Sequence, residues 1–228
     1  PSIDYDSIDY YEATDKEAIQ KQLNGHLNLI KEMGFNTIRV CFDRMQCDEN
    51  GQFYYSAKRP FYIDKKQDVE AILKGLDTFL ASAKRHNLHI MLLIKAPLEN
   101  PSIEKTTKKL LQHCQDNPTI SAYDSFNEPL YFDPEAKRTK KDAQKICKNW
   151  QKMMHKYAPR QLFTIGFSEP IEVFEWDPTM LPVDFIEIHT YHPLRVCSEI
   201  YWYAMHANKP WMIGETGLPA DNDSISYD

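Results

Sequence analysis

The sequence predicts an α/β protein in which parallel strands alternate with helices, and three observations lead to that fold class. Short apolar runs rich in β-branched residues alternate with longer stretches whose apolar residues recur at helical spacing. The alternation continues through most of the 228 residues. The 7 glycines include no glycine-rich phosphate loop of the kind that opens a nucleotide-binding sheet. These observations favour a (β/α)8 TIM barrel over an open doubly wound sheet, which remains the alternative.

The first helix is expected between Thr14 and Met33, where apolar residues recur every three or four positions. Thr14 and Glu17 fit a capping box at its start, and Gly34 follows as a stop. Directly afterwards, NTIRVCF at residues 36–42 is short, β-branched and mostly apolar, as in a buried strand. A helix followed at once by a buried strand indicates a parallel sheet covered by helices.

The same unit repeats toward the C-terminus. Four further helices are expected, one ending near His86, one around Leu110 and Leu111, one from Ala143 to Met153, and one from Tyr201 to Ala207. Five further strands are expected at residues 89–94, 120–126, 162–167, 183–189 and 211–215. Six strands are two short of a closed barrel. We therefore expect residues 1–228 to form a single (β/α)-barrel domain that lacks the first and last strands.

The composition argues against several classes of partner. The 33 acidic and 27 basic residues are scattered, the formal net charge is −6, and no long basic block is present to follow a nucleic-acid backbone. No stretch approaches the roughly 18 apolar residues that a membrane-spanning helix needs. We expect no nucleic-acid partner, no membrane span and a monomer.

The cysteines do not form a recognisable framework. Five residues, Cys41, Cys47, Cys114, Cys147 and Cys197, are too few and too widely spaced for a disulfide scaffold. Cys41 and Cys47 could pair across a loop, and the alternative is that Cys41 is a buried strand thiol. No CxxC pattern indicates zinc, and we expect no cofactor and no metal.

Polar side chains gather where predicted strands end. Asn127 and Glu128 follow one strand, His189 and Tyr191 lie at the end of another, and Glu215 ends the last. Barrel enzymes place their active sites on the loops that follow the carboxyl ends of the strands. About three βα units separate Glu128 from Glu215, so the two carboxylates could converge across the barrel mouth. Paired carboxylates suit glycosidic bond cleavage, because one donates a proton to the leaving oxygen while the other attacks or stabilises the sugar.

Four segments in a consistent order carry a family resemblance. FNEP at residues 126–129 and IGETG at residues 213–217 resemble the fourth-strand and seventh-strand motifs of glycoside hydrolase family 5. HTYH at residues 189–192 is similar to that family's sixth-strand motif, and GFNTIRV at residues 34–40 resembles its arginine-carrying second-strand segment. The resemblance covers most of the chain. It implies a cellulase-like TIM barrel that cleaves O-glycosidic bonds of a β-linked poly- or oligosaccharide with retention, by double displacement.

The resemblance also implies roles for individual residues. It makes Glu128 the general acid/base and Glu215 the nucleophile, and it gives substrate-binding or orienting roles to Arg39, Asn127, His189 and Tyr191. Asn127 would donate to the sugar 2-hydroxyl, His189 would line the site, and Arg39 and Tyr191 would hold the nucleophile. The residues themselves leave two alternatives: Arg39 could pair with a structural acid, and Tyr191 could be a packed aromatic.

Two other functions stay open. The resemblance departs at the third strand, where LLIKAP ends with Lys95 near the place at which the family often has a histidine. A barrel that binds carbohydrate without cleaving it is therefore one alternative. The other is a metal-dependent barrel hydrolase with His189, His192 and Glu215 as ligands.

The insertion from Asp43 to Lys66 follows the second barrel strand and is rich in tyrosine and phenylalanine. We expect it to shape substrate subsites through Phe53, Tyr54, Tyr55 and Phe61. No residue pattern indicates which glycan or linkage is bound. Since polysaccharides lie mostly outside cells, the expected location is extracellular, periplasmic or at the cell surface.

Overall fold

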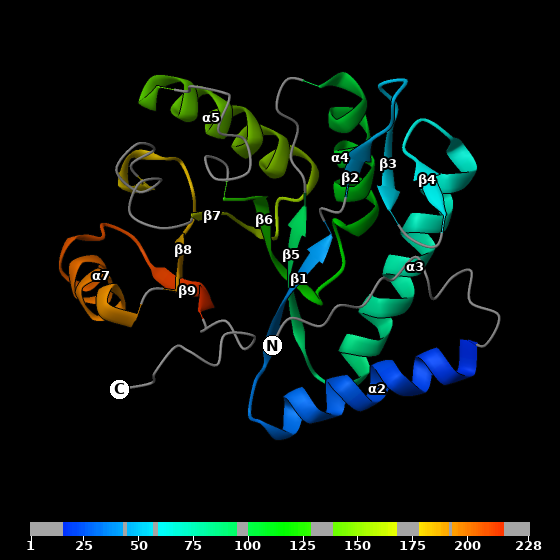
Figure 1. The fold of residues 1–228 in the computed structure, drawn as a ribbon, viewed down its shortest axis with the longest axis horizontal. Helices are drawn as coiled ribbons and strands as arrows, with labels where there is room; N and C mark the ends of the chain where they lie inside the picture. Colours follow the sequence, from blue (N-terminus) through cyan, green and yellow to red (C-terminus); the bar gives the residue numbers. More distant parts are fainter. Residues whose placement is uncertain are drawn as a thin grey trace. The chain divides into compact units, whose positions relative to one another are not determined.

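The structure, a computed structural model, describes residues 16–42, 45–56, 59–94, 100–128, 139–167, 178–191 and 193–216. Its parallel strands follow one another in the order β1-β5-β6-β7-β8-β9, with helices between them (Figure 1). Six parallel strands with this order and alternation correspond to part of a (β/α)8 barrel, so the predicted fold class is confirmed. The chain divides into two compact units, residues 1–126 with 149–163 and residues 127–148 with 164–228. The single-domain assignment remains a prediction.

The first unit contains the strands that begin the sheet. Strand β1 (Thr37–Phe42) pairs in parallel with β5 (His89–Ile94), residue for residue along its whole length. Strand β6 (Ile120–Asn127) pairs with the other edge of β5. Five of the six β5 residues are buried, as expected for a parallel strand covered on both faces.

Three helices belong to this unit: α2 (Lys16–Glu32), α3 (Lys66–Arg85) and α4 (Pro101–Cys114). Helix α2 buries Leu23, Leu27 and Ile30, the stripe that its spacing predicts. Helix α4 starts at Asn100, whose side chain accepts hydrogen bonds from two backbone N–H groups of the first turn, with Pro101 following. The proposed capping residue Thr14 lies outside the described residues.

A small antiparallel sheet follows β1 in the first unit. It consists of β2 (Met45–Cys47), β3 (Phe53–Ser56) and β4 (Pro60–Tyr62). The β2–β3 turn contains Gly51 at φ 77°, and the Asp48 side chain accepts hydrogen bonds from the backbone N–H groups of Asn50 and Gln52. Within its described residues, the insertion therefore contains a hairpin and a third strand.

The second unit contains β8 (Ile186–Thr190), β9 (Trp211–Thr216) and α7 (Pro193–His206), and a short 3₁₀ turn at Pro178–Met180. Strand β7 (Leu162–Phe167) pairs with β8, and β8 pairs with β9, all in parallel. The connecting helix α5 spans Lys140–Tyr157, and part of it belongs to each unit. Figure 1 shows α7 beside β8.

The described residues bear on two further expectations. None of the five cysteines is in a disulfide, so Cys41 and Cys47 do not pair, and both are exposed. The alternative that Cys41 is buried is wrong, because β1 buries its alternate residues Ile38, Val40 and Phe42. Within the described ranges, every helix is too short or too polar to cross a bilayer.

Candidate active site

Strand β8 separates apolar and polar side chains onto opposite faces. Ile186 and Ile188 are buried and pack with Ala207, Trp211 and Ile213. Because side chains alternate along a strand, the intervening Glu187 and His189 point to the other face. Both of these polar residues are almost completely buried. A buried acid and a buried histidine on one face of a strand are candidates for a functional site.

Strand β9 brings Glu215 beside His189 through an irregularity in the pairing. Ile188 pairs with Ile213, but the next residue, His189, pairs with Glu215, so Gly214 is an extra residue in β9. Directly paired residues of neighbouring strands point to the same face. The register shift therefore places Glu215 on the face that carries His189, although Glu215 itself keeps 26% of its side-chain surface exposed.

Glu128 lies directly after β6 in a backbone conformation that L-residues seldom adopt. Its φ is +47°, in the left-handed region, and its N–H donates to the carbonyl of Gly166 at 2.8 Å. A non-glycine residue there is held at a cost on the order of 1 kcal/mol or more, and such residues concentrate at functional sites. The conformation directs a nearly buried carboxylate toward β8.

These residues surround the imidazole of His189. Nδ1 of His189 lies 2.7 Å from Oε1 of Glu128, and Nε2 lies 3.6 Å from Oε1 of Glu187 and 3.8 Å from Oε1 of Glu215. The hydroxyl of Tyr191 donates to Oε2 of Glu215. One oxygen of Glu128, one of Glu215 and a ring nitrogen of His189 all lie within 4.8 Å of one another. The sequence-predicted Glu128, His189, Tyr191 and Glu215 are therefore brought together.

The short contact between His189 and Glu128 allows a proton to occupy either partner. If Glu128 is ionised, Nδ1–H of His189 donates to it, and if Glu128 is protonated, its hydroxyl donates to Nδ1. Burial strengthens such interactions because little water screens them. The arrangement can therefore hold a proton at Glu128 and release it to a substrate oxygen.

The same cluster has the composition of a metal site, since Glu128, His189 and Glu215 each offer one ligand atom. The metal site predicted as an alternative consisted of His189, His192 and Glu215. His192 lies outside the described residues, and the cluster seen here contains Glu128 together with His189 and Glu215. Imidazole with two carboxylates suits zinc and related divalent ions.

Two of the predicted residues have other surroundings. Asn127 is the last residue of β6 and half-buried, immediately before Glu128. Arg39, in the first unit, donates from both Nε and Nη2 to Oδ2 of the buried Asp124. That ion pair is the structural alternative raised from the sequence, and a role of Arg39 toward Glu215 remains a prediction.

The aromatic insertion does not supply four subsite side chains. Tyr55 and Phe61 are buried: the Tyr55 ring centroid lies 5.3 Å from that of Phe42, and the Arg59 guanidinium stacks 3.8 Å above the Phe61 ring. The expectation that these two side chains contact substrate is wrong, because they form the apolar face of the small sheet. Phe53 and Tyr54 are half-buried and remain candidates.

Sequence reasoning missed one member of the cluster, Glu187. A signal was present, because VDFIEIH has an acid within an otherwise apolar strand, two residues before a histidine. Residues two apart lie on the same face of a strand, so the acid had to accompany His189. An acid that shares a strand face with a predicted site histidine is therefore itself a candidate member of the site.

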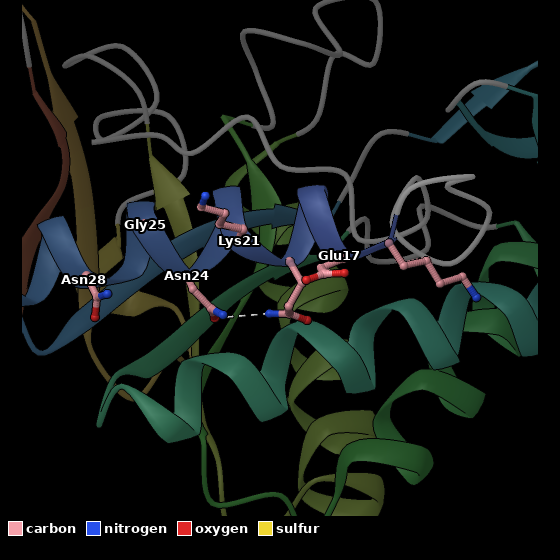
Figure 2. A pocket seen from close by; sticks show the side chains of 7 residues that line it. Glu17, Lys21, Asn24, Gly25 and Asn28 are labelled. Carbon is pink, nitrogen blue, oxygen red and sulfur yellow. Dashed lines mark hydrogen bonds between the residues drawn. The ribbon is translucent and has the colours of Figure 1, made fainter.

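A separate hollow lies along helix α2 in the first unit and is lined by polar side chains of that one helix (Figure 2). Gln20 donates there to the side chains of Asn24 and Ser82. The residues that line the hollow include one acid, Glu17, so no pair of carboxylates converges among them. The Glu128–His189–Glu215 cluster is therefore the better candidate for chemistry.

Comparison with known proteins identifies the fold. No family model matches the chain, and no curated protein matches it. Many solved structures do. An exo-β-1,4-mannosidase from Opitutaceae bacterium strain TAV5 is 14% identical, with a TM-score of 0.65. The match covers 92% of this chain and 43% of the mannosidase chain. A glycoside hydrolase family 5 mannosidase from Rhizomucor miehei (E301A mutant) is 14% identical with a TM-score of 0.63, covering 93% and 67%.

A β-1,4-mannanase from the sea hare Aplysia kurodai is similar over more of its length, at 15% identity and a TM-score of 0.58, covering 95% of this chain and 77% of its own. The chain thus spans from about two fifths to about three quarters of the lengths of these three proteins. Identities this low establish a shared fold and no more. The fold is that of part of a (β/α)8 barrel, as in these glycosidases.

Proposed function

We propose that this chain is a retaining glycoside hydrolase acting on β-linked poly- or oligosaccharides, with Glu128 as general acid/base and Glu215 as nucleophile. The observation that supports it most is that oxygens of the two carboxylates lie within 4.8 Å of each other. Retaining enzymes hold their two carboxyl groups about 5–5.5 Å apart, whereas inverting enzymes separate them by about 6.5–9.5 Å to admit a water.

In the first step, a carboxylate oxygen of Glu215 bonds to the anomeric carbon as the glycosidic C–O bond breaks. The proton on Glu128 moves to the departing oxygen, so the products are a glycosyl ester of Glu215 and a free sugar hydroxyl. Tyr191 donates to Oε2 of Glu215, which helps to hold the carboxylate in its orientation.

In the second step, Glu128 acts as a base. A water oxygen bonds to the anomeric carbon, the ester bond to Glu215 breaks, and the water proton passes to Glu128. The contact of His189 with Glu128 at 2.7 Å gives that proton a second place to reside between turnovers. Two displacements at one carbon return the original anomeric configuration.

The names of the similar structures guide the choice of substrate. Mannanases and mannosidases act on β-linked mannose, and these names recur among the matches. We therefore propose β-1,4-mannosides as the first substrates to test, with β-glucosides second because one match is named a β-glucosidase. Such substrates lie mostly outside cells, so the proposed site of action is extracellular, periplasmic or at the cell surface.

The test is turnover of aryl β-mannosides and mannooligosaccharides, with the product configuration followed by proton NMR. Glu215→Gln is expected to lower kcat by on the order of 10⁴-fold or more, because no nucleophile remains. Glu128→Gln should slow substrates with poor leaving groups by about 10²–10⁴-fold but spare glycosylation by dinitrophenyl glycosides, whose leaving group needs no proton. Glu32→Gln, an exposed change on α2, is the matched control.

An inverted product, or full activity in Glu215→Gln, would contradict the assignment. Oligosaccharide binding by wild-type protein without cleavage would instead support the carbohydrate-binding alternative. The metal-dependent alternative is favoured only by the ligand composition of Glu128, His189 and Glu215. It predicts about one tightly bound zinc per chain and loss of activity with a chelator.

A further inference from the structure

We infer that Glu187 is a positioning residue that fixes the proton of His189 on Nε2, leaving Nδ1 to exchange a proton with Glu128. The inference rests on the proposed function only for its kinetic consequences. Its structural basis is a side chain that sequence motifs do not single out, on the same face of β8 as His189.

The first support is the position of the Glu187 carboxylate. Its Oε1 lies 3.6 Å from Nε2 of His189, and neither side chain has any exposed surface. A buried anion at that distance favours a proton on the nitrogen that faces it. With Nε2 protonated, Nδ1 is the nitrogen that can accept from or donate to Glu128, 2.7 Å away.

The second support is that β9 reserves space for this carboxylate. A Cβ added to Gly214 would overlap Oε1 of Glu187, and it would also lie 2.5 Å from Cγ and 2.6 Å from Cδ. Only glycine fits beside Glu187 at this position. Gly214 is also the extra residue at the register shift. The same glycine therefore leaves space for the Glu187 side chain and places Glu215 on the face of the sheet that carries His189.

The contribution of Glu187 differs between the two chemical steps. In the free enzyme, Nε2 of His189 faces two carboxylates, Glu187 at 3.6 Å and Glu215 at 3.8 Å. In the glycosyl-enzyme, Glu215 is an uncharged ester, while Glu187 keeps its carboxylate. Glu187 therefore matters most in the second step, when Glu128 must accept the water proton.

The test combines a spectroscopic and a kinetic measurement on Glu187→Gln, which keeps the shape and removes the charge. Ring ¹⁵N NMR, assigned with a His189→Gln variant, should show Nε2 of His189 protonated in the wild type and a shift of the proton toward Nδ1 in Glu187→Gln. For aryl glycosides, kcat should fall about tenfold and KM should fall with it, because the covalent intermediate accumulates.

Three further variants keep the inference falsifiable. Gly214→Ala should disturb folding, and with it remove both the NMR signal of protonated Nε2 in His189 and the activity, because the added Cβ overlaps Glu187. Adding Glu187→Ala removes the overlap, so the double variant should fold. Thr164→Val, which removes a buried hydroxyl bonded to the Phe185 carbonyl in the same unit, should leave the His189 ring signals unchanged.

Unchanged ring signals in Glu187→Gln would overturn the inference, as would equal loss in both chemical steps. If the wild-type protein has no glycosidase activity, the proposed function fails, but the ring-nitrogen measurement still decides whether Glu187 sets the His189 proton. Should Glu187→Gln not fold, the double variant Gly214→Ala/Glu187→Ala serves for both measurements.

Discussion

Two buried groups of charged side chains in the described part of the chain differ in whether protons can move within them. In the first unit, Arg39 donates twice to Asp124. In the second, His189 lies among Glu128, Glu187 and Glu215. A guanidinium keeps its proton at any pH that a folded protein tolerates, whereas an imidazole can pass a proton to or from a carboxylate that it contacts. Burial of charge alone therefore does not mark a site, and the kind of titratable group does.

The largest expected effect tests the structural side of this contrast. Arg39→Met should lower the free energy of unfolding by about 3–5 kcal/mol, because it leaves the fully buried Asp124 carboxylate without this cation. Urea denaturation measures the change. The double variant Arg39→Met/Asp124→Leu should recover most of the loss. A loss below about 1 kcal/mol in the single variant would show that the pair is not structural.

The small antiparallel sheet extends the structural side. Phe61→Ala should cost about 3–5 kcal/mol of unfolding free energy, because Phe61 is 1% exposed. Tyr54→Ala, on the neighbouring strand and half-buried, should cost much less and change KM for long oligosaccharides if the sheet forms a subsite. Unchanged kinetics of both Tyr54→Ala and Phe53→Ala would remove the insertion from the substrate site.

The chemical side is tested with a smaller change. Tyr191→Phe removes the hydroxyl that donates to Glu215 and should lower kcat/KM by about tenfold, the effect of one hydrogen bond to a charged group. The free energy of unfolding should stay within about 0.5 kcal/mol, because Tyr191 is 42% exposed. A large loss of stability with normal kinetics would make Tyr191 the packed aromatic of the alternative interpretation.

The smallest expected effect concerns two buried cysteine thiols that burial keeps protonated. Burial raises the pKa of both the Cys114 and Cys147 thiols to about 12. Below that pH each added pH unit raises the thiolate fraction tenfold, but the fraction stays negligible at pH 8. Iodoacetamide at pH 8 should therefore modify Cys41, Cys47 and Cys197 and spare the other two, as read by mass spectrometry. Modification of Cys114 in folded protein would contradict this.

Much of the fold could be predicted because its signals are local. Strands β1, β5, β7 and β9 begin and end within one residue of the predicted runs, since short apolar runs between helices have few other solutions. Strand β8 starts at Ile186 rather than Val183, and the carbonyls of Leu181 and Val183 before it accept hydrogen bonds from the side chain of Lys209. That contact joins residues far apart in sequence.

The hairpin and part of the site were missed for different reasons. The Asn50-Gly51 pair before the aromatic run at residues 53–55 is a hairpin signal that the sequence contains. The pairing of Arg39 with Asp124 could not be read from the sequence, because it depends on two strands that are not neighbours in the chain. Sequence motifs identify candidate site residues at strand ends, but the pairing register of the strands determines which of these side chains contact one another.

The left-handed backbone at Glu128 bears on how such a protein could drift over evolution. Asparagine or glycine would occupy φ +47° with less strain, so mutation at this position away from glutamate tends to be rewarded with stability. A lineage that no longer needed turnover would be expected to lose this glutamate early. Glutamate at this position therefore carries a cost in stability that asparagine or glycine would not carry.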